Sequence, residues 1–292
     1  MRRYQFATVD VFTDRRFGGN QLAVVPDATG LMSEEMQAIA AEFNFSETTF
    51  VLPPDDPAHT ARVRIFHRTA ELPFAGHPNV GTAFVLAGAR DEPRFMFEEQ
   101  AGLVVVDVHR SAAGTPIGAT ITAPQPLTLG DELSVGTLSA CVTLQPSDIV
   151  VRHHAPRWAA TGNWFILAEV SADALARATP DVAAFRRAAA RHLVAGRLSV
   201  YLYARVGDGV RARMFAPLSG TVEDAATGSA AAPLGALLLS LNGADFGEVD
   251  IIQGVEMGRP SRLRVTARRQ SDGIVSTISG SCVAVTRGEL TV

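Results

Sequence analysis

The sequence predicts an α+β protein made of two similar halves, each with a β-sheet rolled around a central helix. Three observations support this fold class. Strand-like runs outnumber helical segments along the 292 residues, one strand-loop-helix phrase occurs twice, and the helix after each copy is apolar on all sides. A chain of this length with 47% hydrophobic residues also suits two domains better than one.

Strands are expected where valine, isoleucine, threonine or aromatic residues cluster. The runs read YQFATVDVFT, QLAVVPD, TTFVLP, ARVRIFH, GLVVVDVHR, WFILAEV, LSVYLYAR and RARMFAP. A helix is expected after Ser33, because apolar residues recur there at helical spacing, at Met36, Ile39, Ala40 and Phe43. A second amphipathic helix is expected from Asp181 to Leu193.

The repeated phrase is ELPFAGHPNVG at residues 71–81 and EDAATGSAAAP at residues 223–233. Each copy places a glutamate five positions before a glycine and a polar residue. The likeness extends upstream, where RVRIF precedes the first copy and RARMF the second, with three extra residues between strand and glutamate in the second. Two matching units predict an internal duplication, with chance similarity in Ala/Gly-rich sequence as the alternative.

The central helices are expected to follow the glycine-polar pair of each half. The first reads PNVGTAFVLAGA and the second SAAAPLGALLLSLNG, and neither has a charged face. Pro78 suits the first turn of one helix, and Asn242-Gly243 suits the C-terminal cap of the other. Pro233 is compatible with the second helix only if that helix starts near Ser229.

Each helix start is a candidate anion site. The first turn of a helix presents free N–H groups and the positive end of the dipole, and Gly76 and Gly228 let a ligand approach the backbone closely. We expect two such starts, facing across a cleft, to hold the carboxylate and the reacting carbon of one small acid. The alternative is that both glycines only serve tight turns.

Composition narrows the function classes. The net charge of -4 gives no basic field for nucleic acid, so a small molecule or a protein is the expected partner. Cys141 and Cys282 lie far apart and outside any metal-ligand spacing, which predicts two buried thiols. The N-terminus lacks the apolar region of a signal peptide and no stretch approaches 18 uncharged apolar residues, so we expect no membrane span and a cytoplasmic location.

Five segments together resemble one protein family. They are VDVFTDRRFGGNQLAVV, FSETTFVL, RIFHRTAELPFAGHPNVGTA, EDAATGSAAAP and QGVEMGRPSRL. In this order, spread from about residue 8 to 290, they are similar to the signature segments of the phenazine-biosynthesis isomerase (PhzF-like) family, which has the diaminopimelate epimerase fold. The resemblance implies two halves, each a sheet rolled around a central helix, with the active site between them. It also suggests a homodimer.

Two sets of positions depart from what the resemblance leads us to expect. Prolines are expected after Asn20 and after Asp224, where this chain has Gln21 and Ala225, and these changes affect loop stiffness more than chemistry. The wider fold includes epimerases and racemases that use a cysteine immediately before each glycine-polar pair. Here those positions hold Ala75 and Thr227. Because alanine can neither take up nor donate a proton, two-thiol epimerisation is disfavoured.

Glu47 is the candidate general acid/base. It lies in NFSETTFVL at the expected junction of the amphipathic helix and a strand, with Phe45 and Phe50 nearby. Apolar surroundings raise the pKa of a carboxyl group towards neutrality, which lets one residue take a proton and return it. The resemblance implies that the matching glutamate moves a proton along one face of a dihydro-hydroxyanthranilate, converting the enol-diene to a ketone. The alternative is a glutamate that ends a strand in solvent.

His77 and Asp224 match the other polar active-site residues of the family. The resemblance implies that His77 donates to a substrate hydroxyl or amine or stabilises developing charge, and that Asp224 binds the amino group. Without the resemblance, His77 is interpreted as a capping or buried structural residue. Substrate contacts, mainly through backbone N–H groups and short side chains, are expected from Asn20, Ser46, Gly76, Gly228 and Ser229.

Other features receive a structural interpretation. His153-His154 has no carboxylate or thiol at ligand spacing, so we expect an exposed loop and no metal site. FGGNQ lacks the spacing of a dinucleotide fingerprint, and FRRAAARHL is interpreted as a solvated helix face. No lysine occurs in any of the motifs, so a pyridoxal Schiff base has no candidate there.

We therefore predict an isomerase without metal or cofactor that acts on a small cyclic amino or carboxylic acid, with Glu47 as the proton carrier. The halves are expected to span residues 1–123 and 124–274, with residues 275–292 as a candidate strand returning to the first half. An epimerase, racemase or dehydratase of the same fold is the first alternative. The second is a small-molecule binding protein without turnover. Deuterium incorporation from solvent separates the enzymes from the binder.

Overall fold

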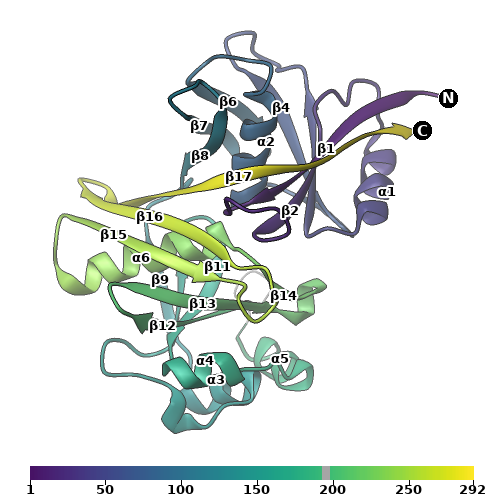
Figure 1. Cartoon of the computed structure of the whole chain (residues 1–292). Helices are drawn as coiled ribbons and strands as arrows, with labels where there is room; N and C mark the ends of the chain where they lie inside the picture. The colour runs from purple at the N-terminus through teal and green to yellow at the C-terminus, as the bar shows by residue number, and fades with distance from the viewer. Residues whose placement is uncertain (193–197) are drawn as a thin grey trace. The chain divides into compact units, whose positions relative to one another are not determined.

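The structure is a computed structural model that describes residues 1–192 and 198–292 (Figure 1). The chain divides into two compact units. Unit 1 comprises Met1–Pro124 and Ile278–Val292, and unit 2 comprises Gln125–Thr277. Across the ranges that the structure describes, we find no helix with the length and apolar character needed to cross a membrane.

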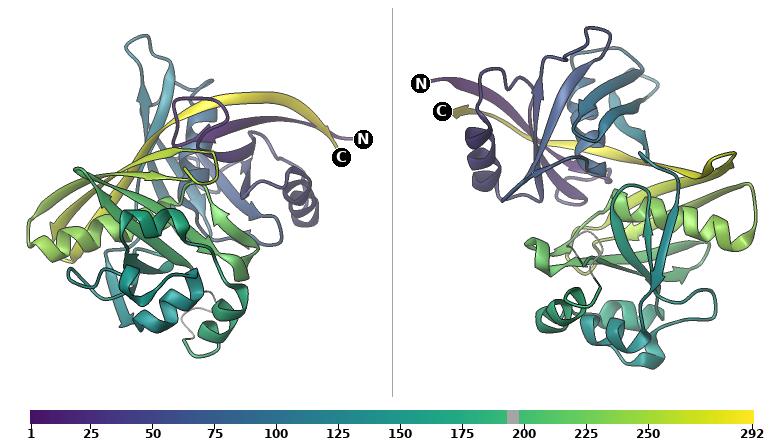
Figure 2. Two further views of the ribbon diagram at one scale, coloured as in Figure 1. Left: turned by 60° about the horizontal axis from the view of Figure 1, so that its bottom comes forward. Right: turned by 180° about the vertical axis from the view of Figure 1, so that it is seen from behind.

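Unit 1 consists mainly of β-structure. Its strands are β1 (Arg3–Val11), β2 (Asn20–Val25), β3 (Glu47–Leu52), β4 (Ala61–His67), β5 (Glu71–Leu72), β6 (Arg94–Glu99), β7 (Gly102–Arg110) and β8 (Pro116–Thr122). Its helices are α1 (Ser33–Phe43) and α2 (Gly76–Leu86). The long strand β17 (Gly273–Thr291) begins in unit 2 and ends in unit 1. Both views of Figure 2 show the two chain ends side by side, because β1 pairs with the end of β17.

The strands of unit 1 close into a cylinder around α2. Pairing runs from β17 through β1, β2, β3, β4, β6, β7 and β8 and returns to β17. The helix packs against β1, β2, β3, β7 and β8, and most of its residues are buried. Where β8 meets β17, a Cβ on Gly118 would lie 2.1 Å from the carbonyl oxygen of Gly280, so only glycine fits there. This architecture confirms the rolled sheet and the central apolar helix predicted for the first half.

Helix α1 confirms the helix expected after Ser33. Its apolar face packs into a core with β3 and β4, through Met36, Ile39, Ala40, Phe50 and Phe66. The helix ends at Asn44, whose φ of 54° is left-handed and turns the chain away from the helix axis. Strand β3 then begins at Glu47. The sharp helix end therefore sets Glu47 at the junction that the sequence predicts.

Unit 2 contains the remaining elements. Its strands are β9 (Thr128–Glu132), β10 (Arg157–Ala160), β11 (Trp164–Glu169), β12 (Val200–Val206), β13 (Gly209–Ala216), β14 (Thr221–Asp224), β15 (Phe246–Gln253) and β16 (Ser261–Gln270). Its helices are α3 (Val135–Val142), α4 (Ala172–Arg177), α5 (Val182–Ala189) and α6 (Gly228–Asn242), with short 3₁₀ turns η1 (Pro146–Asp148) and η2 (Pro217–Ser219).

The strand pairing of unit 2 repeats that of unit 1. In unit 1 the pairs β1/β2, β2/β3, β3/β4, β4/β6 and β6/β7 alternate between antiparallel and parallel. In unit 2 the pairs β10/β11, β11/β12, β12/β13, β13/β15 and β15/β16 alternate in the same order. Helix α6 packs against β10, β11, β15 and β16, as α2 does against its own strands. The shared topology supports the internal duplication inferred from the repeated phrase.

Helix α6 begins and ends where the sequence predicts. It starts at Gly228, and Gly243 closes it with a left-handed φ of 72°. Pro233 lies in the second turn, so it removes the N–H that would bond to the carbonyl of Ser229. The helix tolerates this loss near its N-terminus and continues for nine further residues.

The two repeated glutamates are explained by a clamp that occurs in both units. Arg64 on β4 donates from Nε and Nη2 to the carboxylate of Glu71, at 2.7 and 2.6 Å. Arg213 on β13 binds Glu223 in the same bidentate way, at 2.8 Å for both bonds. Each guanidinium also lies over the phenylalanine two positions later in its strand, 5.0 and 4.8 Å from the ring centroid. The three extra residues of the second copy form η2. Each clamp ties a strand to the loop that leads into a central helix.

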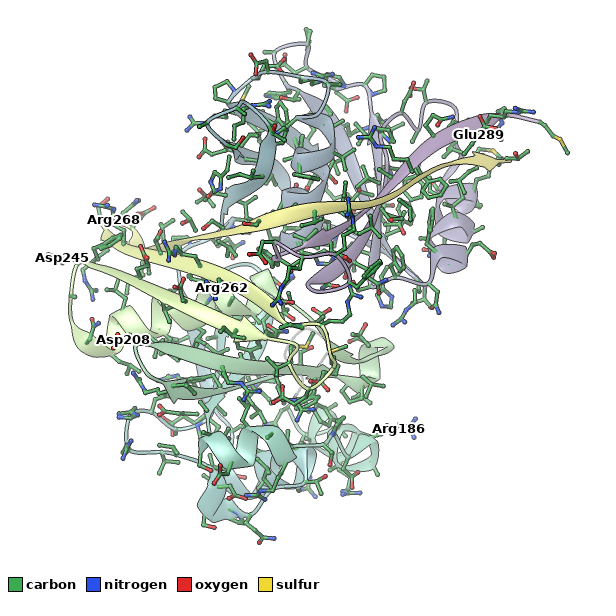
Figure 3. All side chains as sticks on the ribbon, in the orientation of Figure 1. Arg186, Asp208, Asp245, Arg262, Arg268 and Glu289 are labelled. Carbon is green, nitrogen blue, oxygen red and sulfur yellow. The ribbon has the colours of Figure 1, made fainter. Side chains whose placement is uncertain are left out.

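Two predictions for unit 2 need correction. The helix expected from Asp181 to Leu193 is shorter, because α5 ends at Ala189, and Leu193 lies outside the described residues. Figure 3 shows Arg186 of this helix at the outer edge of unit 2, in keeping with a solvated face. His153 is exposed as expected, but His154 is buried, because its Nε2 bonds to the hydroxyl of Tyr203 at 2.8 Å.

Candidate active site

Glu47 and His77 approach each other in unit 1. Glu47 is the first residue of β3 and His77 the second residue of α2, and Nε2 of the histidine lies 3.5 Å from Oε2 of the glutamate. The His77 side chain is 5% exposed and that of Glu47 is 16% exposed. A carboxyl group and an imidazole are therefore held together at the edge of the buried helix, with the carboxyl partly open to solvent.

His77 is electrically neutral at physiological pH. Burial lowers the pKa of His77 to about 3, and a hydrogen bond with the backbone of Gln21 opposes this shift only in part. The 3.5 Å contact with Glu47 is therefore between a carboxyl group and a neutral ring rather than a salt bridge. Its Nε2 has no partner at hydrogen-bond distance within the described chain.

Asn20 and Ser46 extend this group of side chains. The Ser46 hydroxyl donates to Oδ1 of Asn20 at 3.0 Å, and Nδ2 of Asn20 lies 3.4 Å from Nδ1 of His77. We refer to Glu47, His77, Asn20 and Ser46 as the Glu47 cluster. The structure thus brings together all the polar side chains that the sequence analysis selected in the first half.

The position of Asn20 depends on a glycine. Gly19 has a φ of +62°, and a Cβ at this position would lie 2.3 Å from the carbonyl oxygen of Val11. Only glycine adopts this conformation at this distance without displacing β1. The tight turn delivers Asn20 to the start of β2, directly opposite Val11.

Asp224 lies in a second polar group, in unit 2. It is the last residue of β14, is 9% exposed, and accepts a 2.6 Å hydrogen bond from the hydroxyl of Thr227. Gln253 donates from Nε2 to the backbone oxygen of Asp224 and to the Thr227 hydroxyl, at 2.8 and 3.0 Å. Its Oε1 accepts from the Thr227 backbone and from Tyr201. We refer to Asp224, Thr227, Gln253 and Tyr201 as the Asp224 cluster.

Of this cluster, the sequence predicts only Asp224 as a site residue, and Thr227, Gln253 and Tyr201 are additions from the structure. Gln253 is fully buried and uses all four of its hydrogen-bonding positions, so it fixes the turn from Asp224 into α6. The available signal was the segment QGVEMGRPSRL, in which Gln253 ends a strand. Tyr201 carried no signal, because a tyrosine inside an apolar strand is typical of a core.

The helix starts expected to bind an anion are present in both units. Gly76 is the first residue of α2, and Gly228 and Ser229 are the first two of α6. Neither N-cap residue, Ala75 or Thr227, caps its helix with a side-chain hydrogen bond. The first-turn N–H groups are thus not consumed by capping side chains.

The strand register shows that the chemistry of the two units is not duplicated. Thr48 pairs with Phe66 and Val200 pairs with Phe215, and these phenylalanines are equivalent in the repeated phrase. The position of Glu47 is therefore occupied by Ser199 in unit 2. By the same alignment, the position of Asp224 is Leu72 in unit 1 and that of His77 is Ser229 in unit 2.

The two cysteines are free and buried, as predicted. Burial raises the pKa of Cys141 to about 11, and it raises the pKa of Cys282 as well. Cys282 lies against the start of the central helix, with Sγ 3.9 Å from the carbonyl oxygen of Val80. Both thiols remain protonated at neutral pH and neither belongs to the Glu47 or Asp224 cluster, so neither is a thiolate base there.

A further carboxyl group lies beneath the start of α2. Both oxygens of Glu99, at the end of β6, are buried, and burial raises the pKa of this residue to about 8, an effect that Asn79 only partly offsets. Nδ2 of Asn79 donates to the backbone oxygen of Ala75, the N-cap of α2, at 3.0 Å. Glu99 is therefore mainly protonated at neutral pH.

Comparison with known proteins agrees with this architecture. The phenazine biosynthesis-like protein family (PhzC-PhzF) matches residues 9–288. An uncharacterised isomerase from Mesorhizobium japonicum is 38% identical over 303 residues, covering 99% of both chains. The trans-2,3-dihydro-3-hydroxyanthranilate isomerase of Pseudomonas chlororaphis is 35% identical over 290 residues, covering 98% of this chain and 99% of the relative.

A solved structure shows the same fold. The crystal structure of a phenazine biosynthesis protein of the PhzF family from Bacillus anthracis superposes with a TM-score of 0.88 at 24% sequence identity, covering all of both chains. The family match spans nearly the whole chain, and it includes both repeated strand-loop-helix units and both polar clusters. The chain belongs to the phenazine biosynthesis-like protein family.

Proposed function

We propose that this protein is an isomerase that moves a proton within a small cyclic amino or carboxylic acid, similar to trans-2,3-dihydro-3-hydroxyanthranilate, with Glu47 as the general acid/base. Relatives named as isomerases, at 35 to 38% identity over nearly the full length, support the isomerase class. The observation that carries the role of Glu47 is its 3.5 Å contact with the neutral, buried His77.

The neutral state of His77 suits a proton carrier. An imidazolium 3.5 Å away would hold the Glu47 carboxyl in its ionised form through Coulomb attraction. A neutral ring leaves both the ionised and the protonated carboxyl accessible, so Glu47 can take a proton from one carbon and return it to another. Asn20 fixes the ring orientation through its amide, and Ser46 fixes Asn20 in turn.

We assign substrate binding to the other residues selected from the sequence. Asp224 is the carboxylate for the substrate amino group, because Thr227 and Gln253 fix its position through the bonds described above. The backbone N–H groups at Gly76, Gly228 and Ser229 serve the substrate carboxylate.

The sequence also limits the alternatives. It contains no lysine at all, so a pyridoxal Schiff base cannot form on this chain. Two-thiol epimerisation needs a cysteine at each pre-glycine position, where this chain has Ala75 and Thr227. A proton shift along one face of the substrate needs a single carrier, which agrees with one glutamate.

The test is proton NMR of trans-2,3-dihydro-3-hydroxyanthranilate in D2O with the wild-type protein and with Glu47→Gln. We expect the wild type to convert the substrate and to place deuterium on a ring carbon. Glu47→Gln should be slower by at least about 100-fold, the usual contribution of a general acid/base. Glu42→Gln, at an exposed position of α1, is the matched control and should behave as the wild type.

The outcomes separate the possible functions. Equal rates for the wild type and Glu47→Gln would contradict the role of Glu47. Deuterium at a stereocentre without a shift of the double bond would identify an epimerase instead. Binding without conversion or deuteration, seen as line broadening of the substrate, would identify a binding protein, and no interaction would exclude this substrate.

We also propose that the protein is a homodimer, on the basis of the family resemblance. Static light scattering after size-exclusion chromatography tests this proposal. A mass near 62 kDa, twice the 31.0 kDa of one chain, is expected, and a mass near that of one chain would contradict it.

A further inference from the structure

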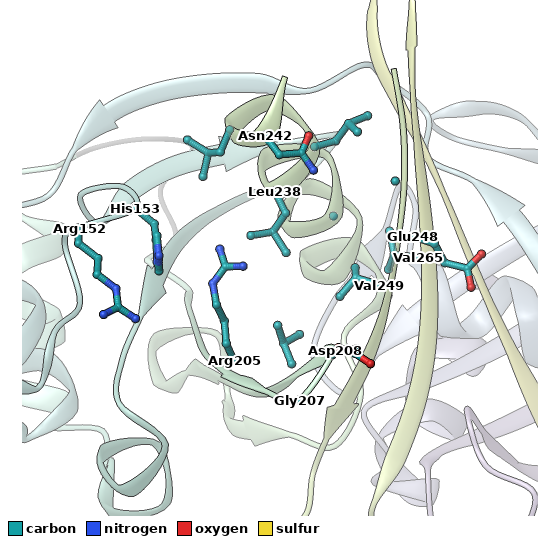
Figure 4. A pocket seen from close by; sticks show the side chains of 16 residues that line it. Arg152, His153, Arg205, Gly207, Asp208, Leu238, Asn242, Glu248, Val249 and Val265 are labelled. Atoms are coloured by element: carbon teal, nitrogen blue, oxygen red, sulfur yellow. The ribbon is translucent and has the colours of Figure 1, made fainter. Parts of the chain in front are cut away.

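Unit 2 contains a cavity that is separate from the Asp224 cluster. Its volume is about 520 Å³, which lies within the usual range for small-molecule sites. It is bounded by the last turns of α6, the hairpin between β12 and β13, the start of β15, and the loop that carries Arg152 and His153 (Figure 4). No member of the Asp224 cluster lines it. Leu238 in its wall is ten residues beyond Gly228 along α6, or about 15 Å at the helical rise.

One wall of the cavity is cationic. Glu169, whose side chain is only 4% exposed, accepts from Nδ1 of His153 at 2.7 Å and lies 3.3 Å from Nε of Arg205. The hydroxyl of Tyr203 also donates to Glu169, at 3.1 Å. These bonds use Nδ1 of His153 and Nε of Arg205. They leave the terminal nitrogens of Arg205 without a hydrogen bond to the described chain, and the same holds for the whole side chain of the exposed Arg152.

The charge of this wall is positive. Two guanidinium groups against the single carboxylate of Glu169 leave a net charge of +1. The acidic residues of the lining do not cancel it. Glu248 is paired with Arg264 at 3.3 Å, and Figure 4 shows its carboxylate directed away from the cavity. Asp208 is exposed in the β12/β13 turn, on the side of the cavity opposite Arg152 in the same view.

The facing wall is apolar. Figure 4 shows Leu238 of α6, Val249 of β15 and Val265 of β16 on the other side of the cavity from Arg152 and His153. Branched aliphatic side chains bind a hydrocarbon group but offer no hydrogen bond. A ligand that satisfies both walls therefore has an anionic end and an apolar body.

The geometry points to a second small-molecule site in unit 2, which binds an amphipathic monocarboxylate with its carboxylate on Arg152 and Arg205 and its hydrocarbon body against Leu238 and Val249. A single negative charge matches the net charge of the cationic wall, whereas a phosphate dianion would leave one charge unpaired. The apolar wall favours a hydrocarbon body over a sugar or a peptide backbone. This site is independent of the function proposed for the Glu47 and Asp224 clusters.

The test is a titration of the full-length protein with octanoate, followed by NMR of labelled leucine and valine methyl groups. We expect saturable shifts at Leu238 and Val249 with a Kd on the order of 1 mM or tighter, as suits a ligand of this size. Arg152→Met should weaken binding by about tenfold or more, because it removes a charge-assisted hydrogen bond. Arg186→Met, the same change on the exposed face of α5, should leave the affinity unchanged.

Two further measurements make the proposal refutable even if one variant misfolds. Leu238→Trp, at a half-buried position, should fill the cavity and abolish the octanoate shifts. The neutral analogue 1-octanol should bind at least about tenfold more weakly than octanoate. Absence of saturable shifts at these methyl groups would overturn the proposal. So would equal binding of octanol, equal binding by Arg152→Met, or shifts that follow protein concentration alone, since the last would show that a second copy covers this face.

Discussion

Replacing Glu223 by glutamine should destabilise the protein much more than replacing its counterpart Glu71. Both glutamates form the same bidentate clamp, but the side chain of Arg213 is 7% exposed and that of Arg64 is 22% exposed. Arg213 also donates from Nη1 to the carbonyl oxygens of Leu175 and Ala178, at 3.0 and 2.8 Å, and so closes the end of α4. Loss of the Glu223 charge therefore leaves a buried guanidinium that cannot move to solvent.

The burial of each arginine determines how much stability its clamp contributes. Removing one partner of a buried ion pair costs about 3 to 5 kcal/mol. Glu256, whose Oε2 lies 4.0 Å from Nε of Arg213, offsets part of this loss, so we expect about 3 kcal/mol for Glu223→Gln. The clamp of unit 1 is closer to a surface pair, and Glu71→Gln should cost about 1 kcal/mol. At about 2 to 4 °C per kcal/mol, Tm should fall by about 6 to 12 °C and about 2 to 4 °C, respectively.

Urea unfolding can measure the two losses separately. The two tryptophans, Trp158 and Trp164, both lie in unit 2, so their fluorescence reports the unfolding of that unit, and far-UV circular dichroism reports the whole chain. Glu132→Gln, at an exposed position of β9, is the control for the loss of one negative charge. An equal or larger loss for Glu71→Gln, at unchanged m values, would refute the argument that burial of the clamp determines its contribution.

Three further substitutions test other parts of the structure. Glu99→Gln should raise Tm more at pH 8.5 than at pH 5. The glutamate of the unfolded chain ionises near its ordinary pKa and the buried glutamate only near pH 8, so the stability of the wild type falls by up to about 5 kcal/mol as the pH rises between these two pKa values. A gain in Tm that is independent of pH would contradict this reasoning. Gln253→Leu should lower kcat with little change in the unfolding midpoint of unit 1, because the substitution removes the hydrogen bonds that hold the turn at Asp224. Unchanged kinetics would show that the side-chain amide of Gln253 only fills the core. Gly19→Ala should lower the free energy of unfolding by about 1 to 3 kcal/mol, measured by urea unfolding. The loss should exceed that of Gly114→Ala, because Gly114 also has a positive φ but has open space around it. Equal losses would mean that the contact with Val11 relaxes freely.

Elements with a strong local signal were predictable from the sequence. The apolar periodicity after Ser33, the glycine-led central helices and the Asn242-Gly243 cap all appear where they were expected. The fold class is confirmed for the same reason, because two copies of one local pattern imply two copies of one supersecondary unit. The assignments of roles to Glu47, His77 and Asp224 stay predictions until the kinetic test is made.

Features that depend on contacts distant in sequence were not predictable. The bonds of Gln253 join residues 26 to 52 positions apart, and its own segment reads as the end of an ordinary strand. Glu99 is buried beside Asn79 of α2, 20 positions earlier in the chain, which no periodicity within EEQAG reveals. His154 was expected in an exposed loop because its local sequence is polar, yet Tyr203, 49 positions later, buries it. Local propensity cannot anticipate such partners.

The scaffold is duplicated, but the polar side chains of the two clusters are not, and this asymmetry bears on the kind of proton transfer that we propose. Inversion of a stereocentre needs one proton carrier for each face of the reacting carbon. The Arg-Glu clamp, the central helix and the strand order are repeated, but Glu47 corresponds to Ser199, and the two pre-glycine positions hold Ala75 and Thr227, the latter with its hydroxyl bonded to Asp224. A serine hydroxyl is a far weaker acid and base than a carboxyl group at neutral pH, so Ser199 does not reproduce Glu47 in unit 2. The absence of a carboxyl group at the position equivalent to Glu47 supports the proposal that one glutamate moves the proton along one face of the substrate.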